Sequence, residues 1–213
     1  MAETEAERNR DLDRFLTFLD AVVAIAITLL VLPLVELAGE AGGGTGSVAH
    51  LLHEHDAEIG AFLLSFAVIS RLWFVQHRAL RNVVAYDDRI AGLLALWMLF
   101  IVFLPFPTAL VAETAGDALT KILYIGTMIL ATIVLCLVEE LLVRHPELSD
   151  GGGLPDPVTG WSSVALLTVA LAITLLVPVT SFFPLFLLLL ADGIARRWRR
   201  LRRGGPDTTG VGG

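Results

Sequence analysis

The sequence has few of the residues on which small secreted domains and soluble enzymes depend. It holds a single cysteine, Cys136, so no intrachain disulfide can form. Charged residues make up only 17% of the chain, whereas soluble domains average about a quarter. No nucleophile–base set, phosphate-binding glycine loop or zinc motif is present, and no polar stretch is long enough to house an enzyme. These absences argue against a soluble enzyme and against a disulfide-stabilised secreted domain.

Apolar residues are abundant instead. They make up 55% of the 213 residues, and the mean hydropathy is +0.75. They lie in long runs separated by charged or glycine-rich stretches, which is typical of membrane spans of about 20 residues. The runs are continuous rather than alternating, so a β-barrel is excluded. We predict an all-α membrane protein with six spans, at about 15–37, 59–78, 90–111, 121–139, 161–180 and 182–197.

The positive charges predict the orientation of these spans. Arginines lie before the first span, between the second and third, after the fourth and after the sixth; the last group is the run RRWRRLRR. Basic loops stay cytoplasmic, so both termini are expected inside, as six spans require. The segment after the first apolar run lacks the small-residue cleavage site of a signal peptide, so the first helix is expected to stay in the mature protein.

The regions outside the spans are short. We expect residues 1–13 to form a cytoplasmic arm, residues 14–200 the membrane domain, and residues 201–213 a disordered tail. The net charge of −7 gives no reason to expect nucleic-acid binding. The arginine run after span six is either a plain cytoplasmic stop signal or a contact with anionic lipid heads.

The first span, RFLTFLDAVVAIAITLLVLPL, carries an apolar stripe on one side. Ile25, Thr28, Leu29 and Leu32 recur at helical spacing and so share one face. This spacing by itself also fits a face that packs on another helix or meets lipid.

The same span begins with charged residues, and intramembrane carboxylates are rare and usually paired. Asp20 lies about 9 Å above Arg14 along the helix, and Arg71 in span two has a similar depth. We therefore expect a polar network of Arg14, Asp20, Arg71, Trp73 and His77 in the inner half of spans one and two. The alternative is a purely structural clamp.

Other polar clusters are weaker candidates. The group His53, Glu54, His55 and Asp56 has metal-binding side chains, but its spacing is loose and a solvated external loop is the favoured interpretation. No metal and no cofactor are expected. In the last span, Arg196 follows Asp192 by one helical turn and could pair with it.

Several of these motifs resemble the transmembrane protein 175 potassium channel family. Arg14, Phe18 and Asp20 match most of the Arg-x-x-x-Phe-Ser-Asp signature that opens the first helix of that family, although Leu19 replaces the signature serine. Further matches are SFAVISRLWFVQHR in span two, with Trp73 and His77, and LFIVFLPFPTALV in span three. The resemblance covers the first three spans; the last three match only in hydropathy and position.

The resemblance implies a cation channel of a prokaryotic plasma membrane, assembled as a homotetramer around four copies of the first helix. Carried onto this chain, Ile25, Leu29 and Leu32 would line the pore and Thr28 would offer a hydroxyl near its narrowest part. The permeant ion would be potassium, and lipid and other copies of the chain would be the only further partners. Nothing resembles the Thr-Val-Gly-Tyr-Gly carbonyl filter. The alternatives are a small secondary transporter or proton-coupled carrier in which Asp20, Arg71 and His77 titrate, and a membrane enzyme or scaffold.

Overall fold

The computed structural model describes residues 2–41, 48–85, 87–114, 117–149 and 157–176. This part is helical throughout apart from short turns. Its elements are α1 (Ala2–Leu29), α2 (Leu32–Ala41), α3 (Val48–Glu54), α4 (Asp56–Leu80), α5 (Asp88–Phe103), α6 (Pro105–Thr114), α7 (Ala118–Arg144), the 3₁₀ turn η1 (Pro146–Leu148) and α8 (Pro157–Leu176). The sixth expected span, with Asp192 and Arg196, and the expected tail lie outside the described residues.

Four helical segments are long and apolar enough to cross a membrane: Arg10–Leu37, Asp56–Leu80, Asp88–Val111 and Ala118–Arg144. They lie over the first four expected spans. A fifth apolar segment, Gly160–Leu176, lies over most of the fifth and extends for about 25 Å at 1.5 Å per residue. The arm expected at residues 1–13 is a direct continuation of α1, which begins at Ala2.

Prolines and aspartates place the ends of several helices. Pro33 has no N–H for the carbonyl of Leu29 and its ring crowds that carbonyl, so the first span breaks between α1 and α2. Pro105 lies at the corresponding boundary between α5 and α6. Asp87 caps α5 by accepting from the backbone N–H of Ile90 at 2.9 Å, and Asp117 caps α7 through Thr120 at 3.2 Å.

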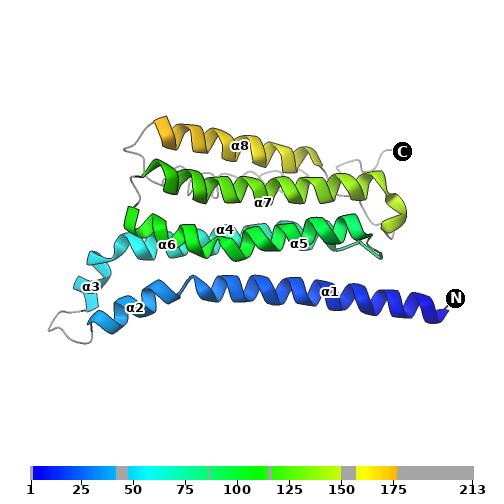
Figure 1. Ribbon diagram of the computed structural model, residues 1–213, viewed down its shortest axis with the longest axis horizontal. Helices are drawn as coiled ribbons and strands as arrows, with labels where there is room; N and C mark the ends of the chain where they lie inside the picture. Colours follow the sequence, from blue (N-terminus) through cyan, green and yellow to red (C-terminus); the bar gives the residue numbers. More distant parts are fainter. Residues whose placement is uncertain (1, 42–47, 86, 115–116, 150–156, 177–213) are drawn as a thin grey trace, which may run out of the picture.

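The helices lie side by side, with α1 and α8 at opposite edges and α4, α5, α6 and α7 between them (Figure 1). In the most apolar window of α7, 61% of the residues are buried, against 22% in the first span. The bundle is therefore built around α7, whereas α1 covers one side of it and keeps a long free face.

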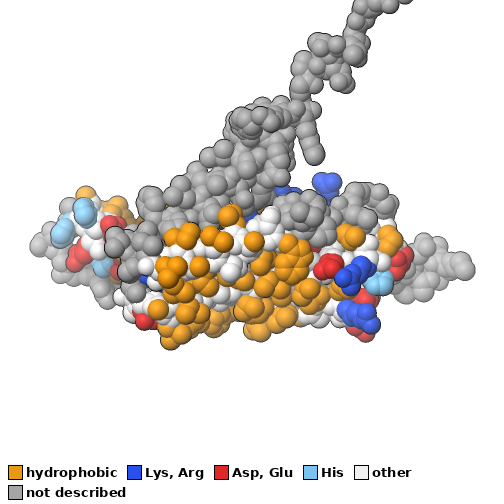
Figure 2. Space-filling model, turned by 90° about the horizontal axis from the view of Figure 1, so that it is seen from above, with side chains coloured by type: hydrophobic (Ala, Val, Ile, Leu, Met, Phe, Trp, Pro, Cys, Tyr) orange, Lys and Arg blue, Asp and Glu red, His pale blue; other side chains and the backbone are white. Residues whose placement is uncertain are grey.

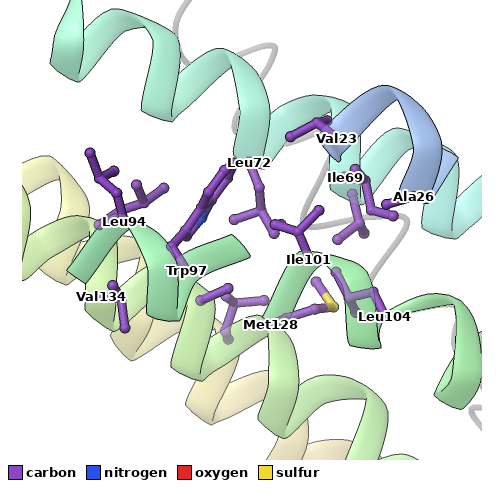
Figure 3. Close-up of a cluster of buried hydrophobic side chains, with 14 of the residues drawn as sticks. Val23, Ala26, Ile69, Leu72, Leu94, Trp97, Ile101, Leu104, Met128 and Val134 are labelled. Carbon is purple, nitrogen blue, oxygen red and sulfur yellow. The ribbon is translucent and has the colours of Figure 1, made fainter. Parts of the chain in front are cut away.

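The core of the bundle is apolar and continuous. In Figure 3, Val23 and Ala26 of α1 lie in one cluster with side chains of α4, α5 and α7, including Ile69, Trp97 and Met128. Outside, an apolar band lies between two charged ends of the molecule (Figure 2). Acidic and histidine side chains gather at the end that holds α3, and arginines and acidic residues gather at the other. This distribution is the one a membrane-spanning bundle requires.

Candidate pore helix and its polar anchor

The buried face of α1 is a narrow apolar row. Leu19, Val23, Ala26 and Leu30 recur every three or four residues and are at most 3% exposed. This row packs on α4, α5 and α6. Because every third or fourth position packs on the bundle, the opposite face of α1 has no neighbour within the part of the chain that the structure describes.

The free face has the same regular spacing. One row of its exposed side chains recurs at intervals of three and four residues, as residues on one helix face do: Phe18, Ala21, Ile25, Thr28, Leu32 and Val35. Thr17, Ala24, Val31 and Glu36 are exposed beside it. Ile25 is 58% exposed and Leu32 is 52% exposed. Leu29 lies beside this row and is 39% exposed. The four residues expected to share one face therefore do so, and that face is open.

Thr28 is the only hydroxyl in the row from Phe18 to Val35. Its Oγ1 donates to the carbonyl of Ile25 at 2.8 Å, within its own helix. The single hydroxyl hydrogen is thereby used, and the oxygen keeps free lone pairs on the exposed face. An oxygen presented in this way can accept hydrogen bonds or contact a cation.

Asp20 is held by one strong contact. The indole Nε1 of Trp73, on α4, donates to Asp20 Oδ1 at 2.7 Å. The Trp73 ring in turn packs on the His77 ring, with centroids 5.4 Å apart. Asp20, Trp73 and His77 therefore form a connected group that joins α1 to α4 near their cytoplasmic ends as the sequence orients them.

The other members of the expected network lie elsewhere, so the expectation of one network is corrected. Arg71 Nη2 donates to Ser163 Oγ on α8 at 3.4 Å, and no hydrogen bond or ion pair joins it to Asp20 in the described part. The reason is the helical angle, because Arg71 and Trp73 lie about 200° apart around α4 and cannot both face α1. Arg14 is exposed beside Arg10, Asp11 and Asp13. Phe18 is 56% exposed, on the face of Ile25.

Leu19, in the place of the signature serine, is fully buried against the bundle. An apolar side chain satisfies this environment by packing alone, whereas a hydroxyl there would need a hydrogen-bond partner. The replacement therefore removes a polar group from the interface between α1 and the bundle and leaves the contact of Asp20 with Trp73 as the polar link.

Sequence reasoning missed two polar features of the interior. Ser65, Thr108 and Tyr124 form a buried hydrogen-bonded group between α4, α6 and α7. Lys121, at the start of the fourth expected span, is 3% exposed, and its Nζ donates to the carbonyl of Thr174 on α8 at 3.4 Å. The available signal was the presence of polar residues within apolar runs, because a buried polar side chain needs a hydrogen-bond partner.

The histidine-rich segment is divided between two helices. His53 and Glu54 end α3, whereas Asp56 begins α4. His55 Nδ1 lies 3.2 Å from Glu58 Oε1, so it pairs within one helical turn. Among the described residues no three metal-binding side chains come together.

Comparison with known proteins gives consistent results. Residues 14–105 match the family model described as the endosomal/lysosomal potassium channel TMEM175. A protein of Chamaesiphon minutus named as a potassium channel is 38% identical over 51% of this chain and 53% of its own length. A Streptomyces collinus protein, also named as a potassium channel, is 29% identical over 66% of each chain. A zebrafish (Danio rerio) protein named as an endosomal/lysosomal proton channel is 24% identical over 63% of this chain.

The fold is also similar to a solved one. The crystal structure of a TMEM175 homologue from Chamaesiphon minutus, titled as a lysosomal potassium-selective channel homologue, has a TM-score of 0.69 and 27% sequence identity. That similarity covers 87% of this chain and 98% of the other. The sequence alignments, in contrast, span about half to two thirds of the bacterial relatives and 26% of the zebrafish protein.

Proposed function

The chain belongs to the TMEM175 family, and from this premise we propose that it forms a potassium-permeable cation channel. Conduction is passive and runs through a central pore lined by α1. In agreement with the sequence, this is a family of channels and not of enzymes. Of the related proteins named above, two are named as potassium channels and one as a proton channel.

One observation carries the proposal: the free face of α1, from Phe18 to Val35, has no neighbour within the described part of the subunit. The exposed face of any helix repeats every three to four residues, so the exposure of this face and the hydroxyl on it support the proposal, and its spacing does not. The exposed row includes Thr28, whose hydroxyl oxygen faces outward. Four such helices around an axis would turn Ile25, Thr28, Leu29 and Leu32 toward a common channel.

The chemistry of this row fits weak potassium selectivity. A ring of isoleucine or leucine side chains supplies no ligands, so an ion must give up part of its water to pass. Potassium sheds water at a lower cost than sodium does. The Thr28 oxygens would replace part of the lost hydration just beyond Ile25.

The proposed assembly is a homotetramer in a prokaryotic plasma membrane, with both termini cytoplasmic. Bacterial relatives support the location. The tetramer is supported by the free face of α1, because the described residues of one subunit leave that row uncovered.

The rival hypothesis is a secondary transporter or proton-coupled carrier in which Asp20, Arg71 and His77 titrate together. It is the less favoured one because Arg71 bonds to Ser163 on α8, away from Asp20. Asp20 is occupied by the indole donor of Trp73.

The deciding experiment is ion flux through purified protein in liposomes. We expect passive potassium flux that follows the imposed gradient, from a sample whose native mass equals four chains. Replacing Ile25 with Ala or Asn should change the potassium-to-sodium permeability ratio, by about two- to tenfold if dehydration at this ring contributes about 0.5–1.4 kcal/mol. The same substitutions at Leu29 and Leu32 test the rest of the row.

Leu63 is the matched control, since it is 52% exposed on α4 and lies on a different helix. Leu63→Ala should leave the ratio unchanged. An unaltered ratio in the variants at all three α1 positions would refute the pore assignment. Flux that requires a counter-substrate or a proton gradient would favour the carrier.

A further inference from the structure

Three hydroxyl groups from three helices meet inside the bundle. Ser65 of α4 has its Oγ 2.9 Å from Tyr124 Oη of α7 and 2.8 Å from Thr108 Oγ1 of α6. All three residues are buried, with exposures of 1%, 1% and 5%. We call Ser65, Thr108 and Tyr124 the hydroxyl chain.

The hydroxyl chain ends on the backbone at the break between α5 and α6. Thr108 Oγ1 also lies 2.8 Å from the carbonyl oxygen of Leu104. Thr108 Oγ1 is the donor toward both Ser65 Oγ and the Leu104 carbonyl, so its single hydrogen serves these two acceptors, while either hydroxyl can donate in the bond between Ser65 and Tyr124. Ser65 of α4 and Tyr124 of α7 thereby hold the Thr108 side chain, and Thr108 bonds to the Leu104 carbonyl through both its hydroxyl and its backbone N–H.

The Leu104 peptide needs such support because of its neighbours. Pro105 and Pro107 have no N–H, so the carbonyls of Ile101 and Phe103 lose their regular helical donors. The backbone N–H of Leu104 bonds to Phe100 at 3.1 Å and to Ile101 at 3.3 Å, which is a tightened turn. Leu104 itself keeps helical geometry and its carbonyl accepts from the Thr108 backbone N–H at 3.1 Å, so Thr108 links the two sides of a turn that lacks two helical hydrogen bonds.

Leu104 is also part of the surface against which α1 packs. Its side chain is fully buried in the cluster that contains Val23 and Ala26 of α1 and Ile69 of α4 (Figure 3). Ala26 is fully buried and is the next residue after Ile25, which is on the free face. A shift of Leu104 would therefore move the support beneath Ile25.

We propose that Ser65, Thr108 and Tyr124 are positioning residues for α1: they fix the Leu104 turn, and Leu104 sets how far the free face of α1 projects. This inference rests on the proposed function for its effect on permeation, but its effect on α1 itself does not depend on conduction.

The test compares Ser65→Ala, Tyr124→Phe and Thr108→Val with Thr108→Ser in the full-length protein. Two quantities are measured: the potassium-to-sodium permeability ratio in liposomes and backbone hydrogen exchange over residues 19–30. We expect the first three variants to change the ratio at least about twofold and to speed exchange about fivefold, the factor expected when a hydrogen bond worth about 1 kcal/mol is lost. Thr108→Ser keeps the hydroxyl, so its permeability ratio and its exchange rate should equal those of the unaltered protein. The double variant Ser65→Ala/Tyr124→Phe should add little to either single variant.

Thr132→Val is the control for the loss of a buried threonine hydroxyl as such. Thr132 is 7% exposed on α7 and donates only to Met128 within its own helix, at 2.7 Å. The Thr132→Val variant should leave both the potassium-to-sodium permeability ratio and the hydrogen exchange over residues 19–30 unchanged. Equal effects of Thr132→Val and Thr108→Val, or no change in α1 exchange in any hydroxyl-chain variant, would overturn the inference. Absence of potassium flux in the unaltered protein would refute the proposed function, while the exchange data would still decide the inference.

Discussion

At the scale of single residues, Asp20 illustrates how a carboxylate is accommodated at the edge of an apolar helix. A charge at this depth is costly unless it is paired or meets water. The 2.7 Å bond from Trp73 satisfies one carboxylate oxygen and ties α1 to α4. The donor is a neutral indole, so the contact positions the acid without neutralising it.

Removing this bond should weaken the packing of α1 on α4 more than it alters the choice of ion. Trp73→Phe takes away the donor and leaves a carboxylate without its partner, which should cost about 1–3 kcal/mol of stability. Asp20→Asn keeps an acceptor oxygen and should cost less. Thermal unfolding and tetramer dissociation measure the loss.

The double variant Asp20→Asn/Trp73→Phe completes a double-mutant cycle. Its loss should be smaller than the sum of the two single losses, because Asp20→Asn weakens the same bond that Trp73→Phe removes. A changed permeability ratio together with unchanged stability in these variants would contradict the anchor role and assign Asp20 to the ion path.

At the scale of helices, prolines and glycines decide how the spans meet. Pro33 and Pro105 break the first and third spans. Gly160 lets α8 approach α7 closely, since a Cβ at that position would lie 2.8 Å from Cys136 Sγ and 3.0 Å from Glu139 Oε2. The contact between α7 and α8 therefore depends on the absence of a side chain there.

Gly160→Ala should destabilise the packing of α8 on α7 by about 1–3 kcal/mol through overpacking. The second substitution Cys136→Ala removes the sulfur that lies nearest and should recover part of the loss. Stability is read from thermal unfolding of the purified protein.

Gly126→Ala is the matched control on α7, where an added Cβ meets nothing within 4 Å. It should raise stability by up to about 1 kcal/mol, because alanine favours a helix over glycine. Equal effects at positions 126 and 160 would refute the close-approach argument.

At the scale of the whole molecule, the two ends differ in charge type. The segment around α3 carries histidines and acidic residues. At the opposite end, Arg81 follows α4 and Arg89 lies in the first turn of α5 (Figures 1 and 2). The predicted orientation puts the arginines in the cytoplasm.

Single cysteines test this orientation in a Cys136→Ala background. His53→Cys, at an exposed site on α3, should react with a membrane-impermeant maleimide in intact cells. Arg81→Cys, exposed after α4, should react only after the membrane is opened. The reverse pattern would show that the protein has the opposite orientation.

The sequence by itself determined the membrane class, the placement of the first five apolar segments and the shared face of Ile25, Thr28, Leu29 and Leu32. The membrane class and the segment placement follow from the length of each apolar run, and the shared face follows from the helical period. Both can be read from neighbouring residues alone. Helix breaks at Pro33 and Pro105 were equally local. The family signature in the first helix was also readable without coordinates.

Only the tertiary structure decided which polar residues meet. Asp20 bonds to Trp73 and not to Arg71, because the rotation of α4 about its own axis turns Arg71 toward Ser163 of α8. Leu19 is buried while Phe18 is exposed, and the hydroxyl chain joins residues 43 and 59 positions apart in sequence. Helical period gives the relative angles within one helix, but the packing of helices on one another decides which angle faces a partner.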